Sequence, residues 1–466
     1  MGEANGNAYE SLARHTEPMI STDLPGPKGR AVIDADAQVT SPSLPRAYSF
    51  VPDRGAGAVI KDVDDNVFLD FNAGIAVCST GHAHPAVVGA IEEQAAKLLH
   101  YSASDFYLPV YAEMCARLAD IAPMDCPSRV FLTNSGTEAV EAAIKLARHN
   151  TGRQYIMSFF GSFHGRSYGS VSLTASKANY RADFGPLLPG VLHAPYAGRF
   201  DSFTGLAGSG DFGGEPAEPD LDYINDVIFK RLAKPHEVAA IVVEPILGEG
   251  GYVVPPRSWL LQLRNMCDAH GILFVADEVQ SGIGRTGSMW AMQHFDLQPD
   301  IVLTGKGIAS GMPLGGMVAR AGLMTWPLGT HGSTYGGNPV SCAAGLATLD
   351  LVAGGLMDNA RTIGDFLMAG LKDLEQRQPA IQEVRGLGLM IGVELPSPLV
   401  ADAIEIAAFK KGLLVLRAGD STIRMAPPLI MNREQAAAGL RLFEEACAEG
   451  VAKSAGLVAE ESMIRA

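Results

Sequence analysis

Two charged residues stand at the ends of two strongly apolar segments. Residues Ile272–Ala276 lead directly into Asp277. Residues Ile301–Thr304 lead through Gly305 into Lys306. Apolar runs of this length are typical of strands that are buried on both faces of a parallel sheet. Ligands of open α/β sheets bind beyond the carboxyl ends of such strands. The sequence therefore predicts that Asp277 and Lys306 lie together at a reactive edge of the sheet.

A lysine beside an aspartate is the combination that pyridoxal 5'-phosphate (PLP) requires. The amine forms a Schiff base with the aldehyde of the cofactor, and the carboxylate keeps the pyridine nitrogen protonated so that the ring can accept electrons. The alternative is a lysine that is ion-paired, or that reaches solvent along an apolar surface, with no part in catalysis. Lys306 by itself does not decide between the two interpretations.

A second segment has the features of a phosphate site. Ser135 and Glu138 have the Ser-x-x-Glu spacing of a capping box, which predicts the start of a helix. Gly136 would let the backbone approach a ligand, and the free N–H groups of a first helical turn suit a phosphate. An ordinary capped helix is the alternative. The apolar stripe of this helix is formed by Val140, Ala143, Ile144 and Ala147.

Aromatic and charged groups follow in three further segments. Phe163 could stack on a flat ring, and Arg166 could bind a carboxylate through its planar fork. A core aromatic beside a surface arginine is the alternative there. Residues 241–243 form another buried-strand pattern, which ends at Glu244. Arg424 lies among apolar residues, where an unpaired charge is costly, so we expect it to have a carboxylate partner or a ligand.

In their order along the chain, these segments resemble the class III, fold-type I PLP-dependent aminotransferases of the 4-aminobutyrate, ornithine and acetylornithine group. The resemblance runs from about Gly55 to Met431. It implies an α/β fold: a large domain with a mostly parallel, seven-stranded sheet flanked by helices, and a smaller α+β domain. The motifs that carry it are Gly81-His82-Ala83-His84-Pro85, Asn134-Ser135-Gly136-Thr137-Glu138, Phe163-His164-Gly165-Arg166, Glu244-Pro245, Asp277-Glu278-Val279-Gln280-Ser281-Gly282, Thr304-Gly305-Lys306-Gly307 and Ser333-Thr334-Tyr335-Gly336-Gly337-Asn338-Pro339.

The resemblance implies a role for each residue of the cofactor site. Lys306 would bind the cofactor covalently and would carry the proton between the substrate carbon and the cofactor. Asp277 would bind the pyridine nitrogen and Gln280 the ring hydroxyl. Val279 and Phe163 would pack on the two ring faces, Gly136 and Thr137 would bind the phosphate, and Thr334 would reach the phosphate of a neighbouring subunit. The resemblance also counts Ser135, His164 and Glu244 among the cofactor-binding residues. The role of Thr334 implies a homodimer, or a dimer of dimers.

Roles in substrate binding also follow from the resemblance. Arg166 would receive the distal carboxylate of an ω-amino acid, and Arg424 would bind the α-carboxylate of 2-oxoglutarate or glutamate. Glu249 would pair with Arg424 when a substrate without an α-carboxylate is bound, so that the pocket never buries a lone charge. Ornithine aminotransferases usually carry a tyrosine where this chain has Ile75. An apolar residue there is the pattern of the 4-aminobutyrate-type enzymes.

The resemblance therefore implies transamination of a 4-aminobutyrate-like ω-amino acid, or a related diamino acid, with 2-oxoglutarate as acceptor. The products would be a semialdehyde and glutamate. Ornithine or acetylornithine as substrate remains an alternative, and amino-acid racemases and epimerases use the same scaffold without a second keto acid. Residues 282–287 fit the G-x-G-x-x-G pattern of dinucleotide folds, but Asp277 and Glu278 just before them would repel a pyrophosphate.

Length and pattern predict the organisation of the chain. With 466 residues, 47% of them hydrophobic, it can bury a large core and should form at least two domains. Helix and strand patterns alternate from about residue 85 to 335, as a doubly wound sheet requires. We expect residues 85–338 to form the PLP-binding domain. Residues 1–84 would contribute to a small domain built mainly by residues 339–466, and a Gly- and Pro-rich loop, 208–219, would be inserted in the large domain.

Charge and cysteine usage argue against several classes of partner. The net charge is −15, from 36 basic and 51 acidic residues without a long basic run, which argues against nucleic acid and anionic membranes as partners. No apolar stretch suggests a membrane span, and the first 24 residues lack a signal-peptide pattern. Six scattered cysteines predict reduced core residues of a cytoplasmic protein. His82 and His84 follow Cys78, but we expect a solvated turn there and no metal.

Overall fold

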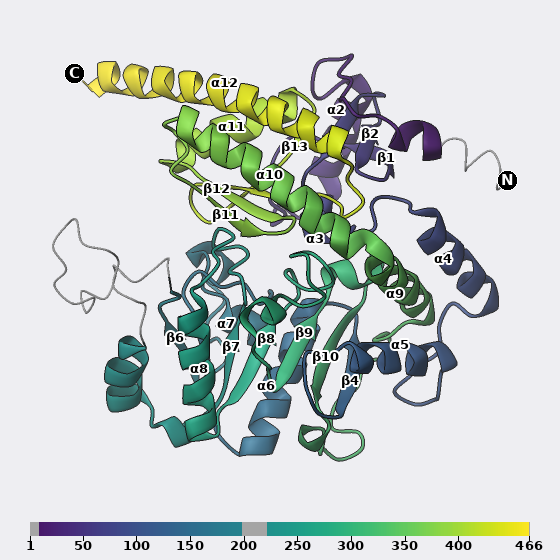
Figure 1. Cartoon of the computed structure of the whole chain (residues 1–466), viewed down its shortest axis with the longest axis vertical. Coiled ribbons are helices and arrows are strands. Elements are labelled where there is room, and N and C mark those ends of the chain that lie inside the picture. Colours follow the sequence, from purple (N-terminus) through teal and green to yellow (C-terminus); the bar gives the residue numbers. More distant parts are fainter. Residues whose placement is uncertain (1–8, 198–220, 466) are drawn as a thin grey trace.

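The structure is a computed structural model that describes residues 9–197 and 221–465. Its centre is a seven-stranded sheet in the order β4-β10-β9-β8-β7-β5-β6 (Figure 1). All neighbours pair in parallel except β10, which is antiparallel to both β4 and β9. The predicted mostly parallel sheet is thus confirmed. Its strands are β4 (Ser128–Thr133), β5 (Tyr155–Phe159), β6 (Val191–Ala194), β7 (Val238–Val243), β8 (Leu273–Asp277), β9 (Ile301–Thr304) and β10 (Gly315–Arg320).

Both faces of this sheet are covered, which explains its unbroken apolar strands. Successive side chains of a strand point to opposite faces. In β7, Val242 belongs to the apolar cluster around helix α6 (Gly136–Thr151). Its neighbours Ile241 and Val243 belong instead to the cluster around helix α8 (Arg257–His270). The short helix α7 (Tyr168–Leu173) lies against α6 and the β5–β6 edge. The predicted loop 208–219 lies outside the described residues.

Two smaller sheets complete the fold. In the first, the hairpin strands β1 (Pro52–Ala56), β2 (Val59–Asp62) and β3 (Val67–Asp70) are joined in parallel by β13 (Leu413–Leu414) from the other end of the chain. The second consists of β11 (Glu383–Leu387), β12 (Met390–Glu394), β15 (Thr422–Met425) and β14 (Leu416–Ala418). Helices α10 (Met357–Arg377), α11 (Pro398–Lys410) and α12 (Arg433–Arg465) lie over these sheets (Figure 1). We propose that the chain divides near residues 84 and 338, since both ends share one sheet.

The remaining helices connect these layers. They are α2 (Pro27–Val39), α3 (Ala73–Ala76), α4 (Pro85–Lys97), α5 (Pro109–Asp120) and α9 (Pro339–Leu351). A ten-residue π-helix spans Tyr223–Leu232. Short turns of 3₁₀ or π helix lie at Ala178–Tyr180, Pro235–Glu237, Ala291–Phe295, Lys306–Ala309, Ala321–Leu323 and Val352–Leu356. Helix α2 carries Pro27 at its first position and buries little more than Gly29, so its sequence has no strong apolar stripe that would have predicted it.

Two expectations from the sequence need correction. The helical stretch Pro339–Arg377 is long and apolar enough to cross a membrane, with a mean hydropathy of 1.6 over its most apolar window. The expectation that no stretch suggests a span is therefore wrong on composition. α9 packs against α4 and α5, and 44% of that window is buried, so its apolar side chains serve the core. Among the cysteines, which are all free, Cys126 is exposed and is not a core residue.

Candidate active site

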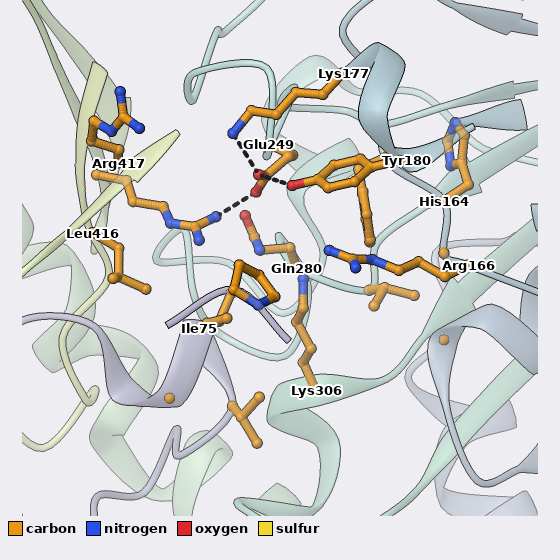
Figure 2. Close-up of a pocket in the computed structure, with 18 of the residues that line it drawn as sticks. Ile75, His164, Arg166, Lys177, Tyr180, Glu249, Gln280, Lys306, Leu416 and Arg417 are labelled. Carbon is orange, nitrogen blue, oxygen red and sulfur yellow. Dashed lines mark hydrogen bonds and ion pairs between the residues drawn. The ribbon is translucent and has the colours of Figure 1, made fainter. Parts of the chain in front are cut away.

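A cavity of about 670 Å³ lies beyond the carboxyl ends of the central strands (Figure 2). It collects every site residue predicted from the sequence except Thr334, which does not line the cavity of its own chain. The strand order explains this, because parallel neighbours deliver their carboxyl ends to one edge of the sheet. The collected residues are Ile75, Ser135, Gly136, Thr137, Phe163, His164, Arg166, Glu244, Glu249, Asp277, Val279, Gln280, Lys306 and Arg424.

Lys306 stands two residues beyond the end of β9, at the first position of a 3₁₀ turn. Its φ of 42° is left-handed, a conformation that costs energy for a residue with a side chain. Burial lowers the pKa of Lys306 to about 8, and the positive charge of Arg424 acts in the same direction. An amine with such a pKa is partly unprotonated near neutral pH and is therefore a competent nucleophile.

Asp277 is oriented by a buried histidine behind it. Its Oδ2 lies 2.6 Å from Nδ1 of His164, and its Oδ1 accepts the Val279 N–H at 3.1 Å. Burial alone would lower the pKa of His164, but the hydrogen bond and charge of Asp277 outweigh it and raise that pKa. His164 therefore holds the Asp277 carboxylate by a charge-assisted hydrogen bond, and this bond fixes the direction in which Asp277 faces the cavity.

Glu244, at the end of β7, has a second role in the same wall. Its Oε2 accepts the Phe163 N–H at 3.0 Å, and its Oε1 accepts the Gly248 N–H at 3.0 Å. The carboxylate thus ties together two loops that carry site residues. Burial raises the pKa of Glu244 to about 7, and the backbone donors counteract this only in part.

The start of α6 forms the floor of the cavity at its other end. The predicted capping box is wrong. The Ser135 side chain makes no capping hydrogen bond, and Glu138 reaches one residue further back, to the Asn134 N–H at 2.6 Å. Ser135 and the first turn therefore line the cavity without a cap. Gly136 is required by packing, because a Cβ there would lie 2.6 Å from Cγ1 of Val279.

Charges at the substrate end form a connected network around Glu249. Arg424 Nη1 donates to Glu249 Oε2 at 2.9 Å, which confirms the carboxylate partner expected for this buried arginine. The other oxygen, Oε1, accepts a hydrogen bond from the Tyr180 hydroxyl at 3.1 Å and lies 3.5 Å from Lys177 Nζ (Figure 2). Burial would raise the pKa of Glu249, but the charges of Arg424 and Lys177 lower it. Glu249 is thus held ionised.

Lys177 and Tyr180 were not predicted from the sequence. Neither residue stands at the end of an apolar strand or in a spacing pattern, and both reach the cavity only through the conformation of the loop after α7. Tyr180 also links Arg166 and Arg424. Its hydroxyl contacts the Glu249–Arg424 pair, and its ring lies 4.4 Å from Cζ of Arg166. Among the described residues, Arg166 has no ion-pair partner, so its guanidinium is left for a ligand.

The residues present fit PLP. Gln280 Oε1 is buried in the cavity wall without a hydrogen-bond partner among the described residues, as expected of a group that awaits a ligand. Gly136 packs closely on Val279, so the first turn of α6 lies next to a side chain, that of Val279, which can cover one face of a flat ring. Lys306 supplies an amine for the aldehyde of PLP, and Asp277 supplies a carboxylate for its pyridine nitrogen. The N-terminus of α6 suits the phosphate of the cofactor.

The central sheet and this set of residues define a fold-type I PLP-dependent enzyme. The chain belongs to the class-III aminotransferase family, whose profile matches residues 42–447, and the cofactor of this family is PLP. It is 37% identical to an alanine/serine racemase of Pyrococcus horikoshii, over 92% of both chains. It is 36% identical to a probable 4-aminobutyrate aminotransferase of Bacillus subtilis, over 84% of this chain and 91% of the other. An ornithine aminotransferase structure from Toxoplasma gondii superposes with a TM-score of 0.80 and 28% identity, over 94% and 97% of the two chains.

Proposed function

We propose that the protein transfers the amino group of a 4-aminobutyrate-like ω-amino acid to 2-oxoglutarate and so produces a semialdehyde and glutamate. One observation carries the proposal: of the four arginines that line the cavity, Arg46, Arg417 and Arg424 are ion-paired with carboxylates within the described residues, and Arg166 is not. Arg424 is neutralised by Glu249, whereas Arg166 has no ion-pair partner among the described residues. A donor with one carboxylate and an otherwise uncharged chain suits this arrangement, because only one arginine is available to it.

The acceptor requires the other state of the same pair. 2-Oxoglutarate carries two carboxylates, so Arg424 must exchange Glu249 for the α-carboxylate while Arg166 binds the distal one. Lys177 and Tyr180 already contact the oxygen of Glu249 that faces away from Arg424. Glu249 therefore keeps Lys177 and Tyr180 as polar partners when Arg424 binds the substrate instead. One pocket can thus serve both half-reactions without burying a lone charge.

The residues around the reacting atoms divide the chemistry among them. When bound, PLP supplies an electron sink and holds the amino group between the half-reactions. Lys306 Nζ would take a proton from the donor carbon and return it, and a pKa lowered to about 8 supports this role because the amine is partly unprotonated near neutral pH. Asp277, held by His164, offers a carboxylate to the pyridine nitrogen, and Gln280 offers an amide oxygen to the ring hydroxyl.

The proposal is tested by measuring each half-reaction alone in two arginine variants. Arg166→Ala should chiefly harm the donor half-reaction, and Arg424→Ala should chiefly harm the reaction with 2-oxoglutarate. The loss of one charge-assisted contact should cost about 2–5 kcal/mol, or roughly 30- to several-thousand-fold in kcat/KM. Arg257→Ala is the matched control. Arg257 stands at the start of α8, pairs with Asp296 and does not line the cavity.

A racemase or epimerase is the second candidate, and the 37% identical alanine/serine racemase favours it. An α-amino acid would place its carboxylate on Arg424, and 2-oxoglutarate would have no role. In that case Arg424→Ala should abolish exchange of the α-hydrogen with deuterated solvent, and added 2-oxoglutarate should not change the rate of this exchange in wild-type protein. Exchange with inversion in wild-type protein, without any response to 2-oxoglutarate, would overturn the aminotransferase proposal. Ornithine and acetylornithine should also be tested as amino donors, because aminotransferases for both amines share this scaffold.

We further propose a cytoplasmic homodimer, or a dimer of dimers, as the working assembly. Thr334 does not line its own cavity, and Tyr335 beside it is 60% exposed. The loop that carries them packs on the segment after α4, where Ser104 Oγ donates to the Ser333 carbonyl at 2.9 Å and Asn338 Nδ2 donates to the Leu99 carbonyl at 3.0 Å. Together they present the exposed apolar residues Leu98, Leu99, Tyr101, Phe106, Tyr107 and Tyr335. A second copy would cover this face and bring Thr334 to the neighbouring cavity.

A further inference from the structure

The short helix α3 at the mouth of the cavity coils in the left-handed sense. Its four residues, Ala73–Ala76, have φ values of 50°, 63°, 69° and 59° in order. A backbone hydrogen bond from Ala76 to Asn72, 2.8 Å long, closes the turn. Each residue that carries a Cβ disfavours this conformation by roughly 5- to 30-fold in equilibrium, and only Gly74 lacks one. The turn therefore depends on support from the rest of the protein.

A buried pair of side chains supplies that support. Asp70 Oδ1 accepts the N–H groups of Asn72 and Ala73 at 2.8 and 2.9 Å. Its Oδ2 lies 2.6 Å from Nε2 of His82. Asp70 is 1% exposed, and His82 is itself fixed by two backbone hydrogen bonds to Gly57. In the solvated turn expected before α4, Ala83 is exposed, but His82 is not solvated, because its ring is buried against Asp70 at only 18% exposure.

The supported turn presents Ile75 to the cavity. Ile75 lines the same cavity as Arg424 and remains 40% exposed; Figure 2 shows it on the side of the cavity where Leu416 lies. On its other side the turn meets the lysine loop: a Cβ on Gly307 would lie 3.7 Å from the Ala76 carbonyl oxygen and 2.4 Å from Ser79 Oγ. A change of φ and ψ at Ile75 to the right-handed region would redirect its Cα–Cβ bond and remove the wall that Ile75 forms there.

We propose that Asp70 and His82 are positioning residues for substrate selection: the pair holds α3 in its left-handed conformation and thereby sets the wall that Ile75 forms against the apolar stretch of the donor. The inference rests on the proposed function only for the identity of that donor. The pair lies behind the turn and does not line the cavity, so it acts through Ile75.

The test compares Asp70→Ala and His82→Gln in the cofactor-loaded protein. We expect the ratio of kcat/KM for 4-aminobutyrate to kcat/KM for 5-aminovalerate to fall at least fivefold. The two amines differ by one methylene. Hydrogen exchange of the 70–80 backbone should rise at least tenfold, with exchange elsewhere unchanged. Ala73→Gly in the His82→Gln background should restore both readouts to within about twofold, because glycine accepts the left-handed conformation. His84→Gln is the matched control: His84 caps α4 and does not contact Asp70.

Each outcome decides the inference. An unchanged substrate ratio and unchanged local exchange in both variants would overturn it, as would a loss that Ala73→Gly fails to rescue. If Asp70→Ala does not fold, His82→Gln carries the test, and Ala73→Gly alone should slow exchange of the turn about threefold or more. If neither amine is a substrate, the proposed function fails, but exchange and its glycine rescue still decide whether the pair holds the turn.

Discussion

At the scale of single residues, the pKa of Lys306 has a direct consequence for cofactor capture. Only the unprotonated amine attacks an aldehyde, and burial places the pKa of Lys306 at about 8. Below that value most of the side chain is ammonium. The rate at which cofactor-free protein captures PLP should therefore rise about tenfold per pH unit below pH 8 and level off above it.

Stopped-flow absorbance of the lysine-bound cofactor measures this rate. Lys306→Ala should show no such band at any pH and should lose turnover. Lys372→Ala on the surface of α10 should reproduce the wild-type profile, because this lysine pairs with Glu375 and does not line the cavity. A capture rate that does not change with pH between about 6 and 9 would show that another group controls the step.

Residues that carry chemistry were the part of the site most accessible from sequence. Lys306, Asp277 and Glu244 follow apolar strands, and the position of a strand end in a parallel sheet is a consequence of topology. Lys177 and Tyr180 were missed because their place depends on how one loop folds back over Glu249. No periodicity in the sequence encodes that contact.

At the scale of secondary-structure elements, the packing of α6 on Val279 predicts a sensitive glycine. In Gly136→Ala the new Cβ would lie 2.6 Å from Val279 Cγ1, so the helix start or the valine must move. Overpacking of this kind costs about 1–3 kcal/mol, and we expect the affinity for PLP to fall by about 5- to 150-fold.

Equilibrium dialysis measures that affinity, and thermal unfolding of the cofactor-free protein shows that the fold is kept. Gly89→Ala is the control, since Gly89 lies in α4 with nothing within 4 Å of the added Cβ, and its substitution should leave the affinity for PLP unchanged. Equal affinity for PLP in the Gly136 variant would mean that the start of α6 can shift without consequence for the cofactor.

The elements themselves were predictable to different degrees. Buried strands such as β7 and β8 follow from unbroken apolar runs. The capping box at Ser135 was predicted from spacing, but Glu138 bonds to Asn134 instead. α3 was beyond prediction, because a left-handed turn that contains Ile75 opposes local preference and exists only through tertiary support from Asp70. Local rules thus failed at α3 and at the cap of α6.

At the scale of the whole molecule, the exposed apolar face around Tyr107 and Tyr335 predicts self-association. Tyr107 is fully exposed in the single chain, next to other apolar side chains of the same face. Tyr107→Glu should weaken dimerisation at least 100-fold, because a charge would be buried at the interface. Sedimentation should give twice the chain mass for wild type and a concentration-dependent mixture for the variant.

Loss of the dimer should also release cofactor, if Thr334 serves the neighbouring site as proposed. Leu232→Glu is the control, since Leu232 is 57% exposed at the end of the π-helix Tyr223–Leu232 and does not belong to the apolar face. A wild-type protein that sediments as a monomer at micromolar concentration while it retains PLP would contradict the assembly.

The pairing of β3 with β13 has a consequence for biosynthesis. Leu69 and Phe71 receive their backbone partners from Gly412 and Leu414, which leave the ribosome long after them. At roughly 5–20 residues per second, the edge of β3 waits on the order of 20 to 70 s for β13. An unpaired edge invites association with other chains during that interval. The strand that carries Asp70 is therefore completed only after every strand of the central sheet has left the ribosome, since the last of them, β10, ends at Arg320.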